Sequence, residues 1–483
     1  MLDDLIKERL KKLEALRKAG LDPYPAGVSR TSEIKAILSD FAALGKSRKK
    51  VSVAGRVLGL RIQGGLMFVD LKDGSAGIQL VIKKDGFKNF DIFRDNLDIG
   101  DFLEASGPVF KTKKGEQSIE VSGLKFLVKS LRPIPSEHFG IENIETRLRK
   151  RYLDLLVNPG VKEIFEKKAV FWETIRSFLK SDGFLEAATP VLESVPGGAD
   201  AEPFVTHHNA LDRDFYLRIS LELPLKRLLV AGYEKVFEIG RVFRNEGIDR
   251  EHLQEYDSLE FYWSFEDHED GMKLVEKLYK EIVEKVTGGT KTKWENQELN
   301  WGGKWQKVDY FEAFKKEAGI DLNKDVQVSE LKKKADELGI KCEKSWGKGR
   351  MIDAIYKKTV RQKLIQPCFL VGHPVEVSPL AKCDPENPRK VLRLQVLAAQ
   401  SELGNGWAEL NDPVDQRKRF EEQMKLRAAG DKEAQMLDED FVEALEYGMP
   451  PAFGFGLSER LFAVLMNKPI REIVLFPPMR ERG

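Results

Sequence analysis

The stretch FEIGRVFRNEGIDREHLQEYDSLEFY, residues 237–262, contains two apolar segments that are interrupted by charges at regular positions. Because alternate residues of a strand point to the same side, Val242, Arg244 and Glu246 share one face of the first segment. The second segment has a polar face made of Tyr256, Ser258, Glu260 and Tyr262. The stretch therefore predicts an antiparallel hairpin with one apolar and one charged face.

A charged face on such a hairpin needs a partner, because burying an unpaired charge is costly. In a generic hairpin the charged face simply meets water. Here the intervening positions, Leu259, Phe261 and Trp263 among them, are strongly apolar, which favours a sheet inside a core. We therefore expect the charged face to line a pocket.

Composition limits the kind of protein this can be. The 483 residues suggest at least two domains, and 42% hydrophobic residues can build a large core. The formal net charge is only +1, so a nucleic-acid partner would have to be met by local basic patches. The opening residues MLDDLIKERLKK lack the apolar core of a signal peptide, and no run of 18 apolar residues occurs. These features predict a cytoplasmic protein without a membrane span.

The chain divides by its periodicity into an extension, a barrel, a linker and a large domain. Residues 1–49 form a helical extension, in which 2–19 has the apolar spacing of an amphipathic helix. Residues 50–131 contain five short apolar segments separated by Gly and Asp-Gly, which suits a small barrel of the OB type, although other small barrels fit too. Residues 132–146 form a linker, and 147–483 mix helices and strands. The expected fold class is α+β.

Two later stretches add candidate ligand-binding groups. In PPAFGFGLSERLFAVL, residues 450–465, two glycines precede a helix that carries Arg460. Together with Arg244 this offers two guanidinium groups, and planar bidentate donors suit a polyphosphate. The stretch SELGNGWAELNDP, residues 401–413, carries Asn405, Trp407 and Glu409 on one side of a strand.

The combination of these stretches resembles class II aminoacyl-tRNA synthetases, and most of all the lysyl-tRNA synthetase family. Similar segments follow one another along nearly the whole chain: SLRPIPS, RYLDLLVNP, PFVTHHNALD, FRNEG, VEVSPLAK and ELNDPVDQ. The resemblance implies an N-terminal OB-fold anticodon-binding domain and a catalytic antiparallel sheet flanked by helices. It also implies a homodimer that joins L-lysine to tRNA(Lys) through lysyl-adenylate, using ATP and Mg²⁺.

The resemblance also implies roles for individual residues. Arg244 and Arg460 would be catalytic, with Arg244 on the α-phosphate and the lysine carboxylate and Arg460 on the γ-phosphate. The rest of the ATP site would comprise Glu246, His252, Tyr256 and the magnesium ligand Glu402. The lysine site would comprise Glu222, Glu260, Tyr262, Asn405, Trp407 and Glu409. Glu222 and Glu260 would serve the α-amino end, and Glu409 with Tyr262 the ε-amino end.

Two of these residues have a structural alternative. Glu222 could instead pair with a neighbour on a helix, and Phe68 could be an ordinary core residue. In the barrel, the family likeness implies anticodon contacts from Phe68, Gln79 and Glu116, since an aromatic ring can stack on a base and an amide can read its edge.

The chain also departs from the family pattern. Gln395 stands where the family usually has a magnesium-binding Glu, and its amide oxygen could ligate the ion without supplying charge. Glu251 and Glu202 each replace a usual Arg, and the glycine run before Arg460 is shorter than usual. Three alternatives therefore stay open: an aspartate- or asparagine-specific sister enzyme, a relative that lysylates a protein, and a catalytically silent RNA-binding paralogue.

Overall fold

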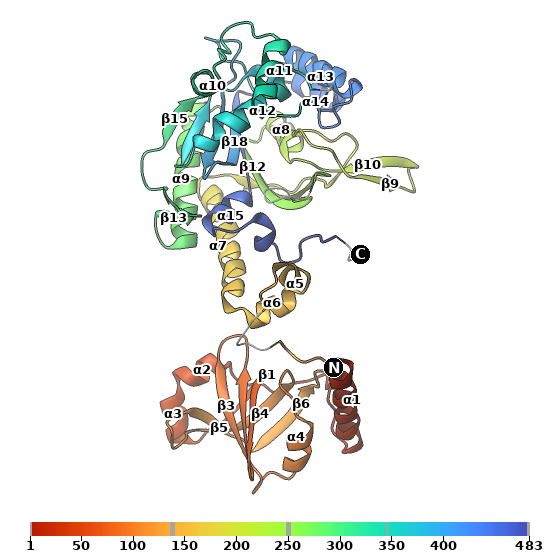
Figure 1. Ribbon diagram of the computed structural model, residues 1–483, viewed down its shortest axis with the longest axis vertical. Helices are drawn as coiled ribbons and strands as arrows, with labels where there is room; N and C mark the ends of the chain where they lie inside the picture. The colour runs from red at the N-terminus through yellow and green to blue at the C-terminus, as the bar shows by residue number, and fades with distance from the viewer. Residues whose placement is uncertain (1, 136–140, 248–252, 344–345, 481–483) are drawn as a thin grey trace. The chain divides into compact units, whose positions relative to one another are not determined.

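The computed structural model describes residues 2–135, 141–247, 253–343 and 346–480 (Figure 1). The chain forms two compact units, Met1–Glu142 and Asn143–Gly483, each with its own hydrophobic core. Within the described ranges, no helix is long and apolar enough to cross a membrane.

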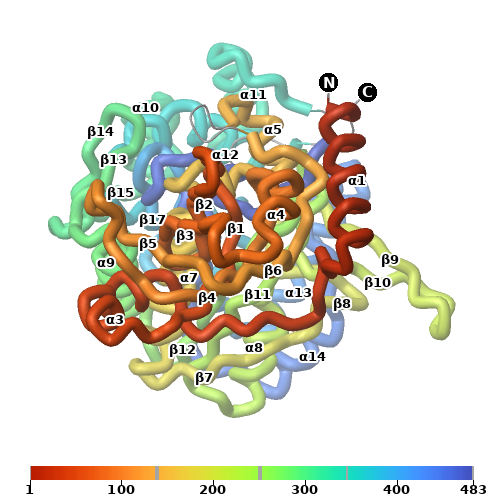
Figure 2. Tube along the Cα trace, turned by 90° about the horizontal axis from the view of Figure 1, so that it is seen from below, coloured from red at the N-terminus to blue at the C-terminus, as the bar shows by residue number. Residues whose placement is uncertain are grey.

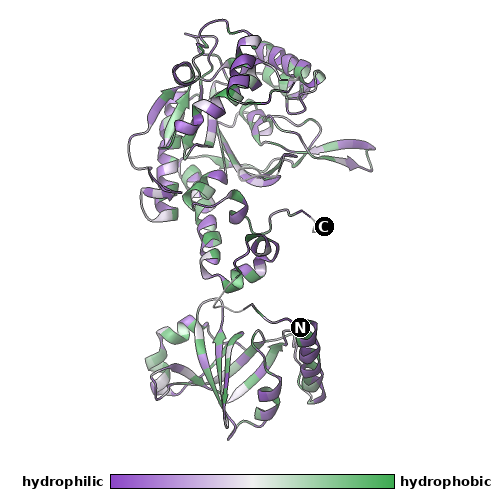
Figure 3. Ribbon diagram, in the orientation of Figure 1, coloured by the Kyte–Doolittle hydropathy of each residue, from purple (hydrophilic) through white to green (hydrophobic). Residues whose placement is uncertain are grey.

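The first unit is built around a closed sheet of six strands in the order β1-β2-β3-β5-β4-β6, with β1 also paired to β4. The strands are β1 (Lys50–Gln63), β2 (Leu66–Lys72), β3 (Gly77–Lys83), β4 (Phe102–Lys111), β5 (Gln117–Glu120) and β6 (Gly123–Val128). Alternate residues point into the barrel, as Met67, Val69 and Leu71 do along β2, and Figure 3 shows hydrophobic and hydrophilic segments alternating along these strands. The predicted OB barrel is confirmed. It has six strands rather than five because the segment 117–128 divides into β5 and β6.

Short helices surround this barrel. They are α1 (Leu2–Lys18), α2 (Ile34–Ser39), α3 (Phe41–Ser47) and α4 (Phe90–Asn96). The helix predicted for residues 2–19 is confirmed as α1, which lies at one side of the barrel in Figure 2. Its Arg9 donates hydrogen bonds from Nη2 to the Ile99 carbonyl at 2.9 Å and from Nη1 to the Ser130 carbonyl at 3.0 Å. The helix is therefore attached to the barrel by specific polar contacts as well as by Leu13 and Leu16, which are buried.

An eight-stranded sheet in the order β15-β16-β17-β18-β19-β12-β11-β7 forms the centre of the second unit. Its strands are β7 (Leu185–Glu186), β11 (Lys235–Phe243), β12 (Glu255–Ser264), β15 (Gln306–Asp309), β16 (Cys368–Val371), β17 (Arg393–Ala398), β18 (Ser401–Ala408) and β19 (Ala452–Ser458). The central strands are antiparallel, whereas β15 and β7 pair in parallel at the two edges. The α+β class is confirmed, and the sheet is mixed rather than purely antiparallel.

Helices cover both faces of this sheet. The principal ones are α7 (Pro159–Ser181), α8 (Glu222–Val230), α9 (His268–Thr287), α10 (Tyr310–Ala318), α11 (Val328–Glu337), α12 (Lys348–Thr359), α13 (Pro413–Ala428) and α14 (Glu439–Glu446). Shorter elements are α5 (Ile144–Arg149), α6 (Arg151–Val157), α15 (Arg460–Leu465), β8 (Leu192–Glu193), β9 (Val205–His208), β10 (Arg213–Leu217), β13 (Lys291–Trp294) and β14 (Gln297–Asn300). Three 3-10 turns complete the unit: η1 (Arg361–Lys363), η2 (Val375–Val377) and η3 (Ile470–Ile473).

The two faces of the predicted hairpin meet different surroundings. Phe237 on β11 and Leu259 and Phe261 on β12 are buried in the core that α7 and α9 share with the sheet. The opposite face carries Glu260 and Tyr262, which line a cavity. Both the hairpin and the pocket beneath its charged face are therefore confirmed.

Candidate active site

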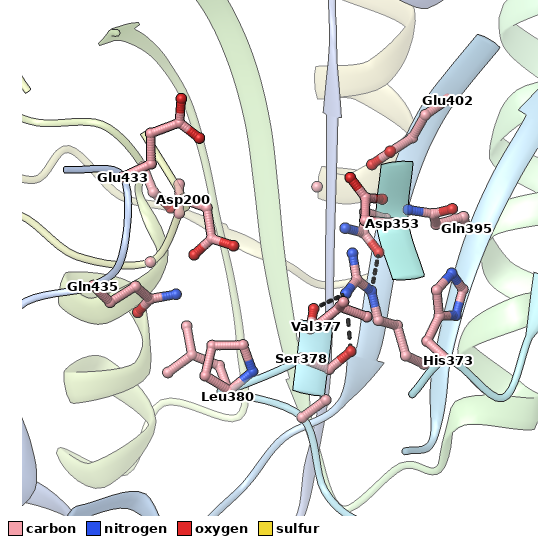
Figure 4. Close-up of a pocket in the computed structure, with 18 of the residues that line it drawn as sticks. Asp200, Asp353, His373, Val377, Ser378, Leu380, Gln395, Glu402, Glu433 and Gln435 are labelled. Atoms are coloured by element: carbon pink, nitrogen blue, oxygen red, sulfur yellow. Dashed lines mark hydrogen bonds between the residues drawn. The ribbon is translucent and has the colours of Figure 1, made fainter. Parts of the chain in front are cut away.

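A cavity of about 1030 Å³ opens over the polar face of the central strands. Its lining comes from the β11–β12 hairpin, from β17, β18 and β19, and from α12, α13 and the segment that follows α13. Figure 4 shows Asp353, His373, Gln395 and Glu402 in one part of the pocket, and Asp200, Glu433 and Gln435 in another. Segments far apart in the sequence thus supply one polar chamber.

Arg244 follows β11 directly and reaches into this cavity. Its Nε donates a hydrogen bond to the Ile219 carbonyl at 3.2 Å, and its guanidinium lies 5.5 Å from the centre of the Tyr256 ring. Burial alone would lower the pKa of Arg244, but the nearby anionic groups, including Glu246 and Glu260, raise it overall. A permanently charged guanidinium beside an aromatic face is suited to a nucleoside phosphate.

Glu260 is held by three donors. Its Oε1 accepts hydrogen bonds from the Ser220 hydroxyl at 2.8 Å and from the Leu221 amide at 2.9 Å, and its Oε2 accepts one from the Tyr262 hydroxyl at 2.9 Å. The Leu221 amide belongs to the N-terminal end of α8, where a negative charge is favoured. Burial nevertheless raises the pKa of the Glu260 carboxyl.

Behind Tyr262 lies a buried cluster formed by Glu222, Lys226 and Glu409. The Lys226 ammonium pairs with Oε1 of Glu222 one turn away on α8 and with Oε2 of Glu409. The helical pairing considered for Glu222 is confirmed, and Glu222 also lines the cavity, so its part in a lysine site stays a prediction. Burial raises the pKa values of Glu222 and Glu409, against the opposing effect of the Lys226 ammonium.

Glu409 keeps one oxygen for a further donor. Its Oε2 also accepts a hydrogen bond from Trp407 Nε1 at 2.9 Å, whereas no donor among the described residues bonds to Oε1. A Cβ added to Gly454 would lie 2.0 Å from that oxygen. The glycine on β19 thus gives Glu409 its space. Glu409 is buried and is not among the residues that line the cavity, although its neighbours Trp407 and Gly454 are.

Glu402 reaches the cavity through an irregularity in β18. Strict alternation would place it on the face opposite to Asn405. The register between β17 and β18 shifts between Val396 and Leu397, so that Gln395 faces Asn405 while Leu397 faces Glu402. This bulge brings Glu402 to the cavity face, and such irregularities recur near active sites. Arg460, the first residue of α15, donates from Nη1 to the Glu402 carbonyl at 3.4 Å.

Comparison with known proteins identifies the family of this chain. The family described as "tRNA synthetases class II (D, K and N)" matches residues 143–480, which include every strand of the catalytic sheet. The chain belongs to the class II tRNA synthetases. The family described as "OB-fold nucleic acid binding domain" matches residues 51–127.

Several curated proteins resemble this class II synthetase over its whole length. A lysine–tRNA ligase of Roseiflexus castenholzii is 44% identical, covering 100% of this chain and 99% of its own. The lysine–tRNA ligase of Moorella thermoacetica is 45% identical over 99% of this chain and 98% of its own. The lysine–tRNA ligase of Bacillus subtilis is 41% identical over 100% and 98%. The resemblance inferred from the motifs is confirmed.

Two important residues of this synthetase were missed from the sequence. Arg393 on β17 donates from Nε to Asn405 Oδ1 at 2.9 Å and from Nη1 to the Val377 carbonyl at 2.6 Å, which fixes the Asn405 amide. Lys226 was missed although its spacing of four residues from Glu222 is a recognisable signal for a helical ion pair. Arg393 gave no such signal, because its partners lie 12 and 16 residues away on other elements.

The remaining predicted residues differ in position. His252 and Glu251 lie outside the described residues. Glu246 lines the cavity, whereas Glu202 is not part of its lining and lies 3.7 Å from Lys432. Arg460 lines the cavity despite the short glycine run that precedes it.

On the barrel, Phe68 and Gln79 lie on adjacent antiparallel strands. Phe68 is half-buried and outside the barrel core, which Met67 and Val69 enter instead. Gln79 accepts a hydrogen bond on Oε1 from the Ser118 hydroxyl at 3.2 Å, and Glu116 is exposed. The side chain of Phe68 is thus accessible from outside the barrel.

Proposed function

We propose that this chain joins L-lysine to tRNA(Lys) in two steps. Lysine and ATP first form lysyl-adenylate and pyrophosphate, and the lysyl group then passes to the terminal ribose of the tRNA with release of AMP. The observation that carries the proposal is a cavity lined by two carboxylates, Glu222 and Glu260, next to which the buried Glu409 keeps an Oε1 without a hydrogen bond. A pocket with several anions selects an amino acid with two ammonium groups.

In the first step the lysine carboxylate attacks the α-phosphorus of ATP, so the protein need not supply a nucleophile. Catalysis then consists of holding the two reactants in line and stabilising the charge that develops on the phosphate. Arg244 suits the α-phosphate and the lysine carboxylate, because it extends into the cavity next to Tyr256. Tyr256 would stack on the adenine, Glu246 would lie near the adenine amino group, and Arg460 would cover the opposite side together with the γ-phosphate.

The lysine site is assigned from the family likeness, and the hydrogen bonds around these residues support the assignment. Glu222 and Glu260 would take the α-ammonium, whereas Oε1 of Glu409 and the Tyr262 hydroxyl would take the ε-ammonium. Trp407 would pack along the aliphatic stem, and Asn405, oriented by Arg393, would contact the substrate carboxylate. An aspartate- or asparagine-specific site would instead need a cation or an amide at the position of Glu409.

The oxygen donors of the cavity suit one magnesium ion. Glu402 supplies a carboxylate and Gln395, which is buried, supplies a neutral amide oxygen. Among the described residues there is no group of three His, Cys, Asp or Glu side chains that could hold a metal without help. Magnesium commonly uses one or two protein oxygens and takes its other ligands from phosphates and water. Glu402 with Gln395 would hold one such ion, which when bound neutralises phosphate charge.

The metal assignment has its own test in Gln395→Glu. A second carboxylate beside Glu402 should lower the Kd of the Mn²⁺ ion bound in the presence of a nonhydrolysable ATP analogue. Electron paramagnetic resonance of free Mn²⁺ measures this Kd without any turnover. An unchanged Kd would contradict the role of Gln395 as a metal ligand.

The barrel would bind the anticodon, with Phe68 stacking on a base and Gln79 and Glu116 contacting base edges. We further infer a homodimer and a cytoplasmic location, where tRNA is charged. The family likeness implies pairing through the helix and strand that end at Pro190. Support for the dimer comes from exposed apolar side chains on these segments, Val170 on α7 and Leu185 on β7. Sedimentation equilibrium of the full chain tests the dimer.

Amino-acid-dependent ATP–pyrophosphate exchange tests the proposed function directly. Each standard amino acid is supplied in turn with magnesium, and only lysine should support exchange. Exchange with aspartate or asparagine would move the chain to the sister enzymes. Absence of exchange with every amino acid, from folded protein, would favour the silent RNA-binding paralogue.

A further inference from the structure

Lys226 is a buried cation that the proposed mechanism leaves without a role. Its side chain is 0% exposed, and its ammonium lies between Oε1 of Glu222 and Oε2 of Glu409. Removing an ammonium from water is costly unless carboxylates compensate for it. An apolar residue at this position of α8 would pack against Tyr262 and Phe441 without that cost, so the charge itself calls for an explanation.

The groups around Lys226 can be counted element by element. Its own helix α8 contributes Glu222, and the segment after β18 contributes Glu409. Strand β12 contributes Glu260 and Tyr262, whose ring centre lies 6.0 Å from Nζ, and α14 contributes the ring of Phe441 at 5.9 Å. With the three carboxylates ionised and Lys226 protonated, this cluster carries a charge of −2, since three negative charges meet one positive charge.

That charge matches the two ammonium groups of free lysine, since Arg244 provides separately for the substrate carboxylate. Without Lys226 the same cluster would carry −3 at low dielectric. The carboxylates would then hold protons to a higher pH than they do beside Lys226, as closely spaced buried carboxylates do. A protonated Glu409 or Glu222 could no longer pair fully with an ammonium group of the substrate.

Lys226 also decides which oxygen of Glu409 is free. The ammonium and the Trp407 indole both bond to Oε2, and among the described residues Oε1 accepts no hydrogen bond. The carboxylate is therefore held at one oxygen, and the other, which is buried, lacks a hydrogen bond. A group that is fixed before the ligand arrives loses less entropy on binding.

We propose that Lys226 is a positioning residue for amino-acid selection, whose ammonium leaves the three carboxylates with the net charge and the free oxygen that a diamino acid requires. This inference rests on the proposed lysine-activating function and deepens it. Lys226 acts through Glu222 and Glu409 and does not touch the substrate.

The test measures the KM values for lysine and for ATP in the exchange reaction of the full chain, for the parent protein and for Lys226→Met. The lysine KM should rise at least about tenfold, as loss of a charge-assisted arrangement implies, while the ATP KM stays unchanged. In the variant the lysine KM should also fall more steeply with rising pH than in the parent, because the surplus proton on the carboxylates must leave. A lysine KM and a pH profile like those of the parent would overturn the proposal.

A matched control exists in the first unit. Lys129 is also a buried lysine between two carboxylates, Asp98 and Asp101, but it lies in the barrel. Lys129→Met should leave the lysine KM and its pH dependence unchanged. An equal rise in both variants would mean that a general loss of stability, rather than the charge at Lys226, explains the effect.

A double variant keeps the proposal testable even where Lys226→Met fails to fold. Lys226→Met combined with Glu222→Gln restores the charge of −2, so its lysine KM should lie below the value expected from adding the two single effects. Where Lys226→Met alone does not fold, the double variant is compared with Glu222→Gln, which leaves a charge of −1, and the two should differ in the pH dependence of the lysine KM. Additive or worse behaviour would contradict charge matching. Parent protein that fails to exchange with lysine would defeat the proposed function itself, whereas a parent that exchanges and an unaffected variant would defeat only this inference.

Discussion

Each compact unit contains a buried lysine that pairs with two carboxylates, but the two clusters differ in how fully their oxygens are hydrogen-bonded. Lys129 in the barrel donates from Nζ to the Asn96 carbonyl at 2.7 Å, to Asp98 Oδ2 at 2.5 Å and to Asp101 Oδ2 at 2.8 Å. The remaining oxygens are also used, since Asp101 Oδ1 accepts from the Ser130 amide and Asp98 Oδ1 pairs with Lys12. The protein satisfies this cluster entirely by itself.

The Lys226 cluster is left incomplete by comparison. Its carboxylates outnumber its ammonium, and Oε1 of Glu409 accepts no hydrogen bond within the described part of the chain. Two polar clusters of the same kind can therefore serve opposite purposes. A cluster that balances its own charge holds a fold together, whereas one with surplus charge and a free oxygen has room for a ligand.

The largest effect is expected on the structural side of this comparison. Lys129→Met leaves Asp98 and Asp101 buried with one cation fewer, which should lower the free energy of unfolding of the barrel by about 3–5 kcal/mol. All seven tryptophans lie in Asn143–Gly483. Urea unfolding is therefore monitored in two ways. The midpoint for the barrel, measured by hydrogen exchange, should move to a lower urea concentration. The midpoint for the second unit, measured by tryptophan fluorescence, should stay unchanged. A shift in both would show that the cluster supports the second unit as well.

In the Lys226 cluster, Glu409→Gln removes the negative charge of the carboxylate whose Oε1 lacks a hydrogen bond. The lost charge-assisted contact is worth about 1.5–3 kcal/mol, so the lysine KM should rise by roughly one to two decades with an unchanged ATP KM. Exchange kinetics measure both constants. Asp101→Asn is the matched substitution in the barrel and should leave both constants alone. A rise in the ATP KM instead would show that the pocket is wrongly assigned.

The outer face of the barrel provides a smaller, separable effect. Phe68→Ala removes a ring from the surface of the barrel rather than from its core, so the KM for tRNA in aminoacylation should rise by the equivalent of about 1–3 kcal/mol for one stacked base. Adenylate formation should be unaffected, as pyrophosphate exchange without tRNA will report. Loss of folded protein would support the alternative interpretation of Phe68 as a core residue.

The smallest expected effect is the pH dependence of lysine binding. Burial raises the pKa values of Glu222 and Glu409, so above the ordinary glutamate pKa of about 4.3 the folded protein without lysine holds more protons than the unfolded chain. Its stability from these groups therefore declines as the pH rises through that window. The arriving ammonium groups displace those protons, so lysine should bind more tightly as the pH rises towards neutrality. Calorimetry in two buffers of different ionisation enthalpy should detect proton release, and proton uptake would reverse this interpretation.

Much of the fold was predictable because local periodicity follows burial. The hairpin of residues 237–262 could be read directly, since its apolar positions alternate and one face enters the core formed with α7 and α9. The barrel was predictable from short alternating segments separated by glycines. The division of its last segment into β5 and β6 was not, because both pieces continue the same apolar pattern.

The amino-acid sequence by itself determined the fold class, the family and most of the residues that line the cavity, because each depends on residue type and spacing along one element. Only the tertiary structure decided how those residues share charge. The bulge that turns Glu402 inward, the bond from Arg393 to Asn405 and the pairing of Lys226 with Glu409 all join separate elements. Donors from α8 and β18 both bond to Oε2 of Glu409 and leave Oε1 without a hydrogen bond. Because these donors come from separate elements, spacing along the chain does not predict this arrangement.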